Sequence, residues 1–128
     1  MSRTYSVRIT SLAIGVPVKW LDNLLSHHEV PGVEGGRQGV ERRISHEGLI
    51  AIEIVRLLTR ELGVPVLNAV AISTSALATR SGLELTHRTA GGVAISLALG
   101  EIEERLRGGL MDALESAAEI RRGRPRSR

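Results

Sequence analysis

Hydrophobic residues recur at helical spacing in five stretches of the chain, and this period predicts a mainly α-helical protein. The expected helices cover about residues 9–14, 17–26, 46–62, 65–79 and 100–119. In the second helix, Val18, Leu21, Leu24 and Leu25 share one side, which we assign to the core. The fourth helix has no charged side, so we expect it to be buried, as often happens at a contact with a second subunit.

Alternating apolar and polar residues, the period of a strand, predict two hairpins. Two short β-prone runs between residues 30 and 44 flank Gly35-Gly36, where glycine supplies the positive φ of a tight turn. The second hairpin covers 83–88 and 93–99. An isolated hairpin is marginal in water, so it must lie on the rest of the protein or on a copy of itself. Residues 4–9 fit either a short strand or the lead-in to the first helix.

The turn Gly15-Val16-Pro17 between the first two helices points to DNA. Pro17 suits the first turn of a helix, because its missing N–H would have no partner there. A helix–tight turn–helix unit of this size places one exposed helix in a major groove. Lys19 and Asn23 lie one turn apart on its outer side, and asparagine can pair bidentately with adenine. We therefore expect DNA contacts from Pro17, Val18, Lys19 and Asn23; an ordinary solvated helix side is the alternative.

The order helix–turn–helix–wing–helix–helix over about residues 5–75 resembles the MerR-like winged helix-turn-helix family. The resemblance is carried by Ser11-Leu12-Ala13, Gly15-Val16-Pro17-Val18-Lys19, Arg42-Arg43-Ile44-Ser45 and Leu62-Gly63-Val64-Pro65. In that family a basic residue early in the second helix contacts DNA, and an arginine on the second wing strand contacts phosphate. Lys19 and Arg42 match these two positions. The family is dimeric and binds pseudo-palindromic operators, so the resemblance implies a DNA-binding homodimer.

The chain also departs from the family. Asp22-Asn23-Leu24 stands where an Arg-Tyr-Tyr-type run is usual, and the wing has Glu41 and Ile44 at positions where aromatics are expected. Replacing an arginine by an aspartate weakens phosphate contact. The long coiled-coil helix and effector domain are missing, so the segment after residue 81 would have to replace them.

We divide the chain into a winged helix-turn-helix domain (1–80), a hairpin-plus-helix dimerisation element (81–120) and a disordered basic tail (121–128). The predicted dimerisation stripe consists of Leu97, Leu99, Ile102, Leu106, Leu110 and Leu114. Gly108-Gly109 interrupts the last helix, either as a kink or as a place where a partner helix approaches closely.

Composition restricts the core and the chemistry of the protein. Trp20 and Tyr5 are the only aromatic residues, so the core must consist of Leu, Ile, Val and Ala. The chain has no cysteine, which excludes disulfides, thiolate metal sites and a cysteine nucleophile. The net charge is +3, but the last eight residues hold five arginines, which leaves 3 − 5 = −2 for the rest. Affinity for DNA must therefore come from local patches and from the tail.

Two basic clusters are candidates for such contacts. The wing carries Arg37, Gln38, Arg42 and Arg43, and arginine forks fit phosphate oxygens and narrow minor grooves. Their alternative role is to keep a loop soluble beside Glu34 and Glu41. The tail segment Arg121, Arg122, Gly123, Arg124, Pro125 and Arg126 contains Arg-Gly-Arg-Pro, which resembles the core of an AT-hook. That resemblance implies minor-groove binding; a solubilising tail is the alternative.

Other chemistry has little support. The four histidines are scattered and lack metal-ligand spacing, no phosphate-binding glycine loop is present, and no Ser/His/Asp arrangement stands out. We expect no metal, no cofactor and no enzymatic activity. No signal peptide or membrane helix is evident, which favours a cytoplasmic, nucleoid-associated protein.

The sequence as a whole predicts a small α+β protein, mainly helical, that acts as a homodimeric DNA-binding transcriptional regulator on double-stranded DNA. Three alternatives stay open. The first is an antitoxin-type or phage regulator that binds a protein partner through its C-terminal half. The others are an architectural, nucleoid-associated protein and a protein-interaction module that no longer binds DNA.

Overall fold

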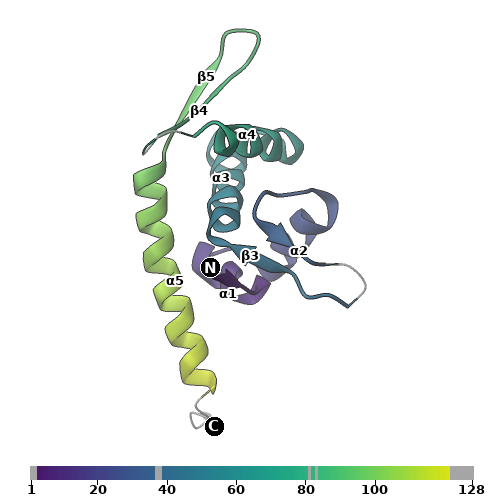
Figure 1. Ribbon diagram of the computed structural model, residues 1–128, viewed down its shortest axis with the longest axis vertical. Coiled ribbons are helices and arrows are strands. Elements are labelled where there is room, and N and C mark those ends of the chain that lie inside the picture. The colour runs from purple at the N-terminus through teal and green to yellow at the C-terminus, as the bar shows by residue number, and fades with distance from the viewer. Residues whose placement is uncertain (1–2, 37–38, 81, 83, 122–128) are drawn as a thin grey trace.

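The computed structural model describes residues 3–36, 39–80, 82 and 84–121. Over these residues the chain is mainly helical with two small antiparallel sheets (Figure 1), which confirms the expected α+β class. The elements in chain order are β1 (Thr4–Tyr5), α1 (Val7–Ile14), α2 (Val18–His27), β2 (Val33–Glu34), β3 (Arg43–Ser45), α3 (His46–Leu62), α4 (Val66–Ala78), β4 (Glu84–Arg88), β5 (Ala94–Ala98) and α5 (Leu99–Arg121).

The helix ends follow local capping chemistry. The Ser6 hydroxyl accepts a hydrogen bond from the Ile9 N–H at the start of α1, and Ser45 accepts one from Gly48 at the start of α3. Gly63 ends α3 in the left-handed conformation with φ 66°. The predicted caps Ser45 and Gly63 are therefore confirmed.

A three-stranded sheet in the order β1-β3-β2 joins the N-terminus to the first hairpin. Tyr5 and Val33 pair with Ile44 from its two sides, and Ile44 is fully buried. The strand β1 settles the choice left open for residues 4–9: Thr4–Tyr5 are extended, and α1 starts at Val7. The sheet fixes the hairpin to the helices, because β3 leads directly into α3.

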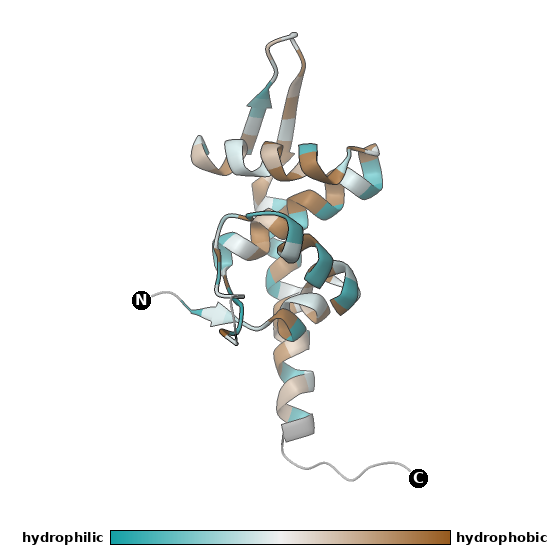
Figure 2. Ribbon diagram, turned by 90° about the vertical axis from the view of Figure 1, so that its right-hand side faces the viewer, coloured by the Kyte–Doolittle hydropathy of each residue, from teal (hydrophilic) through white to brown (hydrophobic). Residues whose placement is uncertain are grey.

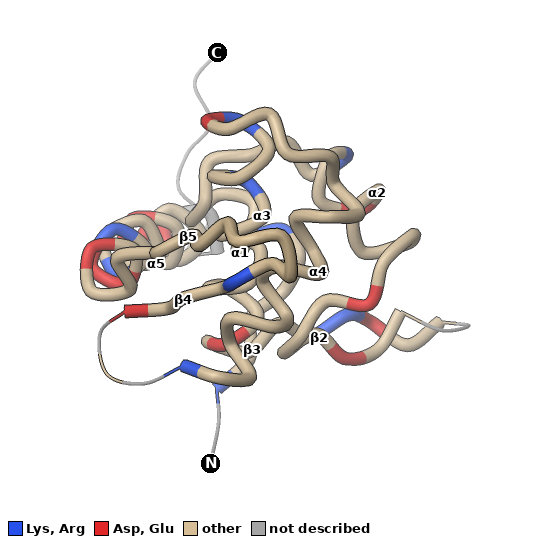
Figure 3. The backbone as a smooth tube through the Cα atoms, turned by 90° about the horizontal axis from the view of Figure 1, so that it is seen from above, with Lys and Arg blue, Asp and Glu red and all other residues tan. Residues whose placement is uncertain are grey.

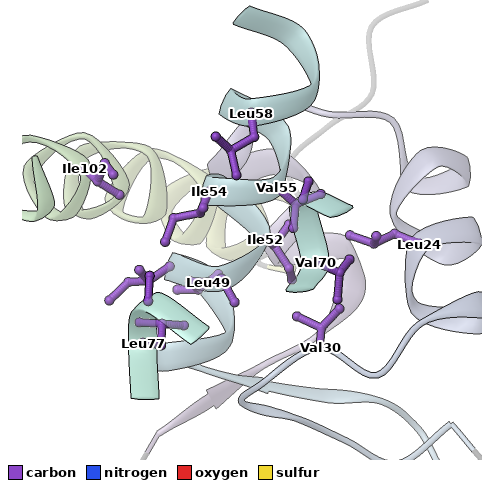
Figure 4. Packing of buried hydrophobic residues seen from close by; sticks show 14 of the residues in the cluster. Leu24, Val30, Leu49, Ile52, Ile54, Val55, Leu58, Val70, Leu77 and Ile102 are labelled. Atoms are coloured by element: carbon purple, nitrogen blue, oxygen red, sulfur yellow. The ribbon is translucent and has the colours of Figure 1, made fainter. Parts of the chain in front are cut away.

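The hydrophobic core surrounds α3, whose residues from Leu49 to Val55 are all buried. In Figure 4, Ile52, Val55 and Leu58 of α3 lie between Leu24 of α2 on one side and Ile102 of α5 on the other. The fully buried hydrophobic side chains are Leu, Ile, Val and Ala, as the composition required. Tyr5 and Trp20 are only partly buried and pack against the edge of this cluster.

One charged residue of α3, Glu53, lies inside the core and joins α3 to α5. Its carboxylate accepts two hydrogen bonds from Arg56, at 2.8 and 2.9 Å, and one from Arg105 of α5 at 3.1 Å. Its side chain is only 4% exposed. The hydrogen bond with Glu53 raises the pKa of Arg56 above its ordinary value, against a smaller opposing effect of burial.

Helix α5 corrects the prediction of a dimerisation stripe. It packs along α1 and α3 of its own chain. Leu99, Ile102 and Leu106 of α5 are buried, as is Leu97 of β5, and Leu110 and Leu114 are half-buried. An apolar stripe looks the same in sequence whether another chain or the same chain covers it. Leu97, Leu99, Ile102 and Leu106 are therefore core residues of one chain, and Leu110 packs against that core.

Gly109 explains how α5 comes so near to α1. A Cβ atom at this position would overlap the carbonyl oxygen of Ala13, the last-but-one residue of α1. Nothing lies within 4 Å of the equivalent atom on Gly108. Of the two hypotheses for this glycine pair, close approach of a helix is thus the one that holds, and the approaching helix belongs to the same chain.

Helix α4 is only half covered, which corrects the expectation that it is buried all round. Its inner side, with Ala69, Val70 and Leu77, packs on α3, whereas Leu67 on the outer side is 69% exposed. Figure 2 shows hydrophobic stretches along α4 where it crosses the upper part of the molecule. Leu62, at the end of α3 beside it, is 63% exposed.

Candidate nucleic-acid interface

A three-residue turn joins α1 to α2 and is fixed by a buried serine. Gly15 leaves α1 with φ 85°, and its N–H donates to the Ser11 carbonyl over 2.8 Å. The Ser11 hydroxyl in turn donates to the carbonyl of Val16 over 2.6 Å. Val16 is buried, so this bond satisfies a carbonyl in the interior. The sequence suggested the turn but gave no sign of the role of Ser11.

The side of α2 that we expected to face DNA is uncovered. Leu21, Leu24 and Leu25 are buried beneath the helix. Pro17, Val18, Lys19 and Asn23 are all exposed on the described surface. Val18 was also expected on the inner side with the leucines; at 43% exposure it lies outside the core, because it is the first residue of the helix, directly after the turn.

The hairpin beside α2 carries a contact of Arg42 that the sequence did not predict. Its guanidinium lies 3.4 Å from the Asp22 carboxylate and donates to the Ser26 hydroxyl over 3.1 Å, so it spans from the hairpin to α2. Its side chain is 21% exposed. The resemblance implied that Arg42 contacts phosphate, and that contact stays a prediction. In the described structure Arg42 holds the hairpin against α2 and offsets the negative charge of Asp22.

Of the other hairpin residues predicted to contact DNA, Arg43 is described by the structure, whereas Arg37 and Gln38 are not. Arg43 is exposed on β3, directly opposite Glu34 of β2. Near the tip of the β2–β3 hairpin, the Gly36 N–H donates a hydrogen bond to the Val40 carbonyl over 2.8 Å. Arg37 and Gln38 lie outside the described residues, and nothing in the structure bears on their predicted contacts.

Charges of both signs are mixed around this surface. Figure 3 shows acidic and basic positions alternating near β2. Glu29, Glu34 and Glu41 are exposed, while the described cations are Lys19, Arg42 and Arg43. The described part of the surface therefore has no broad positive field, as the charge map of the sequence predicted. Any DNA affinity of this surface would have to come from a few placed cations.

An open hollow of about 750 Å³ separates the end of α2 from the hairpin. Leu25, Val30 and Val33 line its apolar part, and Glu34 and Arg42 line its polar part. A hollow with so little enclosure and such a mixed lining gives no clear ligand chemistry. The side-chain hydrogen bonds that the described residues make between the hairpin and α2 are those of Arg42.

The basic tail falls almost wholly outside the described residues. Arg121 is the last residue of α5, and Arg122, Gly123, Arg124, Pro125 and Arg126 follow the described chain. Their predicted contact with a minor groove stays a prediction.

His27 and His28 are adjacent at the end of α2, whereas His46 and His87 lie on other elements. His27 Nδ1–H donates to the Asn23 carbonyl at 2.9 Å, His46 contacts Glu103, and His87 contacts the Ser75 hydroxyl. Among the described residues, no group of three or more His, Cys, Asp or Glu side chains is placed to hold a metal ion.

No family model, curated protein or solved structure matches this chain. Within the described ranges, none of the helices combines the length and the apolar character that crossing a membrane requires.

Proposed function

We propose that this protein binds double-stranded DNA, with α2 in the major groove and the β2–β3 hairpin against the flanking backbone, and that it acts as a transcriptional regulator. The observation that supports this most is the uncovered side of α2. The chain buries Leu21, Leu24 and Leu25 but leaves Lys19 and Asn23 exposed one helical turn apart. A single α-helix fits the width of the major groove of B-DNA.

The surroundings of α2 support the same function. Ser11 and Arg42 brace the helix from both sides, through the turn and through the hairpin. A helix held in this way keeps its orientation when it meets a rigid duplex, so less conformational freedom is lost on binding. Lys19 then supplies a charge to phosphate or to guanine, and Asn23 supplies the bidentate pattern that adenine requires.

The test starts from a selection of random duplexes on the purified protein, followed by binding titrations on the enriched sequence at several salt concentrations. Lys19→Ala should reduce the salt slope by about 1, because one phosphate contact is lost. Asn23→Ala should cost about 1–3 kcal/mol and relax the preference at one base position.

Arg107→Ala is the matched control, since it also removes one exposed positive charge. Arg107 lies on α5, which Figures 1 and 3 place on the side of the molecule away from α2. Failure to enrich any duplex would contradict the proposal. So would a Lys19 variant that binds like the Arg107 variant. Footprints of discrete half-sites support a regulator, whereas continuous coverage would support an architectural protein.

A second candidate function, contact with a basic protein partner, is favoured by the outer side of α5. Glu101, Glu104, Asp112 and Glu115 are exposed along this helix. An acidic surface at the C-terminal half fits a regulator of the antitoxin or phage type. A partner recovered from cell extract should be lost with Glu104→Gln and Glu115→Gln together and retained with Lys19→Ala. Retention by both variants would reject this contact.

A further inference from the structure

Strand β5 has one edge that no other strand covers. The second sheet contains β4 and β5 alone, and β5 pairs with β4 from Ala94 to Ala98. Among the described residues no third strand lies on the other side of β5. In Figure 1 the hairpin extends beyond α4 at one end of the molecule.

The hydrogen bonds of the hairpin show which backbone groups point to the free edge. Thr89 N–H donates to the Val93 carbonyl over 2.8 Å, so this pair is a hydrogen-bonded one. Hydrogen-bonded and non-hydrogen-bonded pairs alternate along an antiparallel ladder. Ile95 and Leu97 therefore bond to β4. The N–H and C=O groups of Ala94, Ser96 and Ala98 point outward, away from β4.

The two edges of this hairpin are protected very differently. Strand β4 carries Glu84 and Arg88 and packs against α4. The stretch from Thr89 to Gly100, which contains β5, has no charged residue and no proline. Soluble proteins usually protect a free strand edge with charges or proline, because an unprotected edge pairs with other chains. An unprotected edge here indicates a strand that is paired in the working protein.

A groove of about 270 Å³ lies directly beside β5, and no described residue of β4 lines it. Its apolar lining comes from Leu57 and Leu62 of α3, Ile95 and Leu97 of β5, and Ile102 of α5. Three charged residues, Glu61, Glu101 and Arg105, line it as well. Leu62 is 63% exposed. The apolar part of this lining lets an added strand bury side chains as well as make main-chain hydrogen bonds.

We propose that β5 pairs antiparallel with β5 of a second copy of this chain, so that two hairpins form one four-stranded sheet in a homodimer. Ser96 is the middle residue of β5. Pairing Ser96 with Ser96 of the second copy, and Ala94 with its Ala98, uses every outward-pointing backbone group of the strand. The small side chains Ala94, Ser96 and Ala98 present no obstacle on that register.

Symmetry favours a second copy over a foreign strand. Adjacent antiparallel strands in a sheet are related by a twofold axis perpendicular to the sheet, which is the operator of an isologous dimer. This axis leaves both copies on the same side of the joined sheet. Leu62 lines the groove beside β5 and therefore lies on the side that the second copy would cover. One contact thus satisfies the free backbone groups and covers the apolar groove, and it does not depend on DNA binding.

The first experiment measures the mass of the full chain in solution by light scattering, without DNA. We expect twice the 13.8 kDa of one chain. Ser96→Lys and Ser96→Glu should each give a chain of single mass, because like charges then face each other across the axis. An equimolar mixture of the two variants should recover the double mass.

Thr86 provides the matched control, because it is exposed on β4 directly opposite Ser96. Thr86→Lys adds the same charge to the same hairpin on its other edge and should leave the double mass unchanged. Circular dichroism on every variant checks that the fold is retained. A wild-type chain of single mass would overturn the proposal and leave the β5 edge for a foreign extended peptide. Equal effects of Ser96→Lys and Thr86→Lys would also overturn it.

A second measurement tests the register itself. The chain has no cysteine, so Ser96→Cys introduces a single thiol. Opposed residues in a hydrogen-bonded pair have Cα atoms about 5.5 Å apart, within the range of a disulfide. Mild oxidation should link Ser96→Cys chains into covalent dimers and leave Thr86→Cys chains unlinked. Failure of Ser96→Cys to cross-link in a confirmed dimer would reject the β5 pairing while leaving DNA binding untouched.

Discussion

Two neighbouring glycines on α5 show how much depends on single residues. Gly108 faces open space, whereas Gly109 is in contact with the backbone of α1 at Ala13. Both positions are glycine, so the sequence alone does not distinguish them. The difference arises entirely from which side of the helix meets α1, and the missing Cβ of Gly109 lets the two helices approach.

Alanine at these two positions should therefore have opposite effects on stability. Gly109→Ala should lower the free energy of unfolding by about 1–3 kcal/mol, because the added methyl group forces α1 and α5 apart. Gly108→Ala should raise it by up to about 1 kcal/mol through helix propensity. Urea unfolding followed by circular dichroism measures both. Stabilisation by both changes would contradict the close approach.

The buried carboxylate of Glu53 gives a second test at this scale. Glu53→Ala should lower the free energy of unfolding by about 2–3 kcal/mol, since it removes three charge-assisted hydrogen bonds. We place it below the usual cost of breaking a buried ion pair because Arg105 is 51% exposed and regains water. Arg105→Ala should cost about 1 kcal/mol or less, because Arg56 still pairs with Glu53. Equal losses on thermal unfolding would show that Arg56 alone does not hold the carboxylate.

At the scale of elements, the turn between α1 and α2 determines where the exposed helix lies. Ser11 joins the last turn of α1 to Val16, and α2 starts two residues later. The side chain of Arg42 adds a contact from the hairpin. The orientation of α2 therefore depends on two polar side chains, and the leucines beneath it supply most of the burial.

Ser11→Ala should lower the free energy of unfolding by about 1–3 kcal/mol, because the Val16 carbonyl loses its partner in the interior. It should also speed amide hydrogen exchange in the first turn of α2. The comparison variant is Ser6→Ala, which removes the N-cap of α1 at a cost of about 1 kcal/mol. Its effect on exchange should be confined to α1. Unchanged exchange in α2 for the Ser11 variant would refute its role in the turn.

Much of the element order could be predicted because its signals are local. Ser45 and Gly63 bound α3 through contacts within a few residues, and glycines mark both hairpin turns. Contacts between distant parts of the chain could not be predicted. The pairing of Arg42 with Asp22 spans 20 residues, and the burial of Glu53 depends on Arg105 of α5. The leucine stripe of α5 was assigned to the wrong partner because periodicity shows that a face is covered, but not by what.

At the scale of the whole molecule, the distribution of charge along the chain decides more about attraction to DNA than the net charge does. The part of the chain before residue 121 has a formal charge of 3 − 5 = −2. The exposed acids of α5 contribute to it, and the five arginines from Arg121 onward reverse it. Any attraction of the whole chain to DNA therefore acts mainly through its C-terminal end.

Deleting residues 122–128, which include four arginines, should leave unfolding unchanged and weaken binding to the selected duplex. The plot of log K against log salt should become less steep by about 3–4, because each arginine–phosphate contact releases about one counterion. A control chain in which these arginines are replaced by lysines should keep the slope. An unaltered slope after deletion would place the tail off the DNA.

The direct passage from β5 to α5 has a mechanical consequence. Ala98 ends the strand and Leu99 begins the helix, with no residue between them. Each residue of an α-helix turns the side chains by about 100°, so one inserted residue at this junction would rotate Ile102 and Leu106 away from α1 and α3. The rotation of α5 about its own axis is therefore fixed relative to β5. Insertion or deletion of a single residue at this junction would therefore move side chains of α5 out of the core.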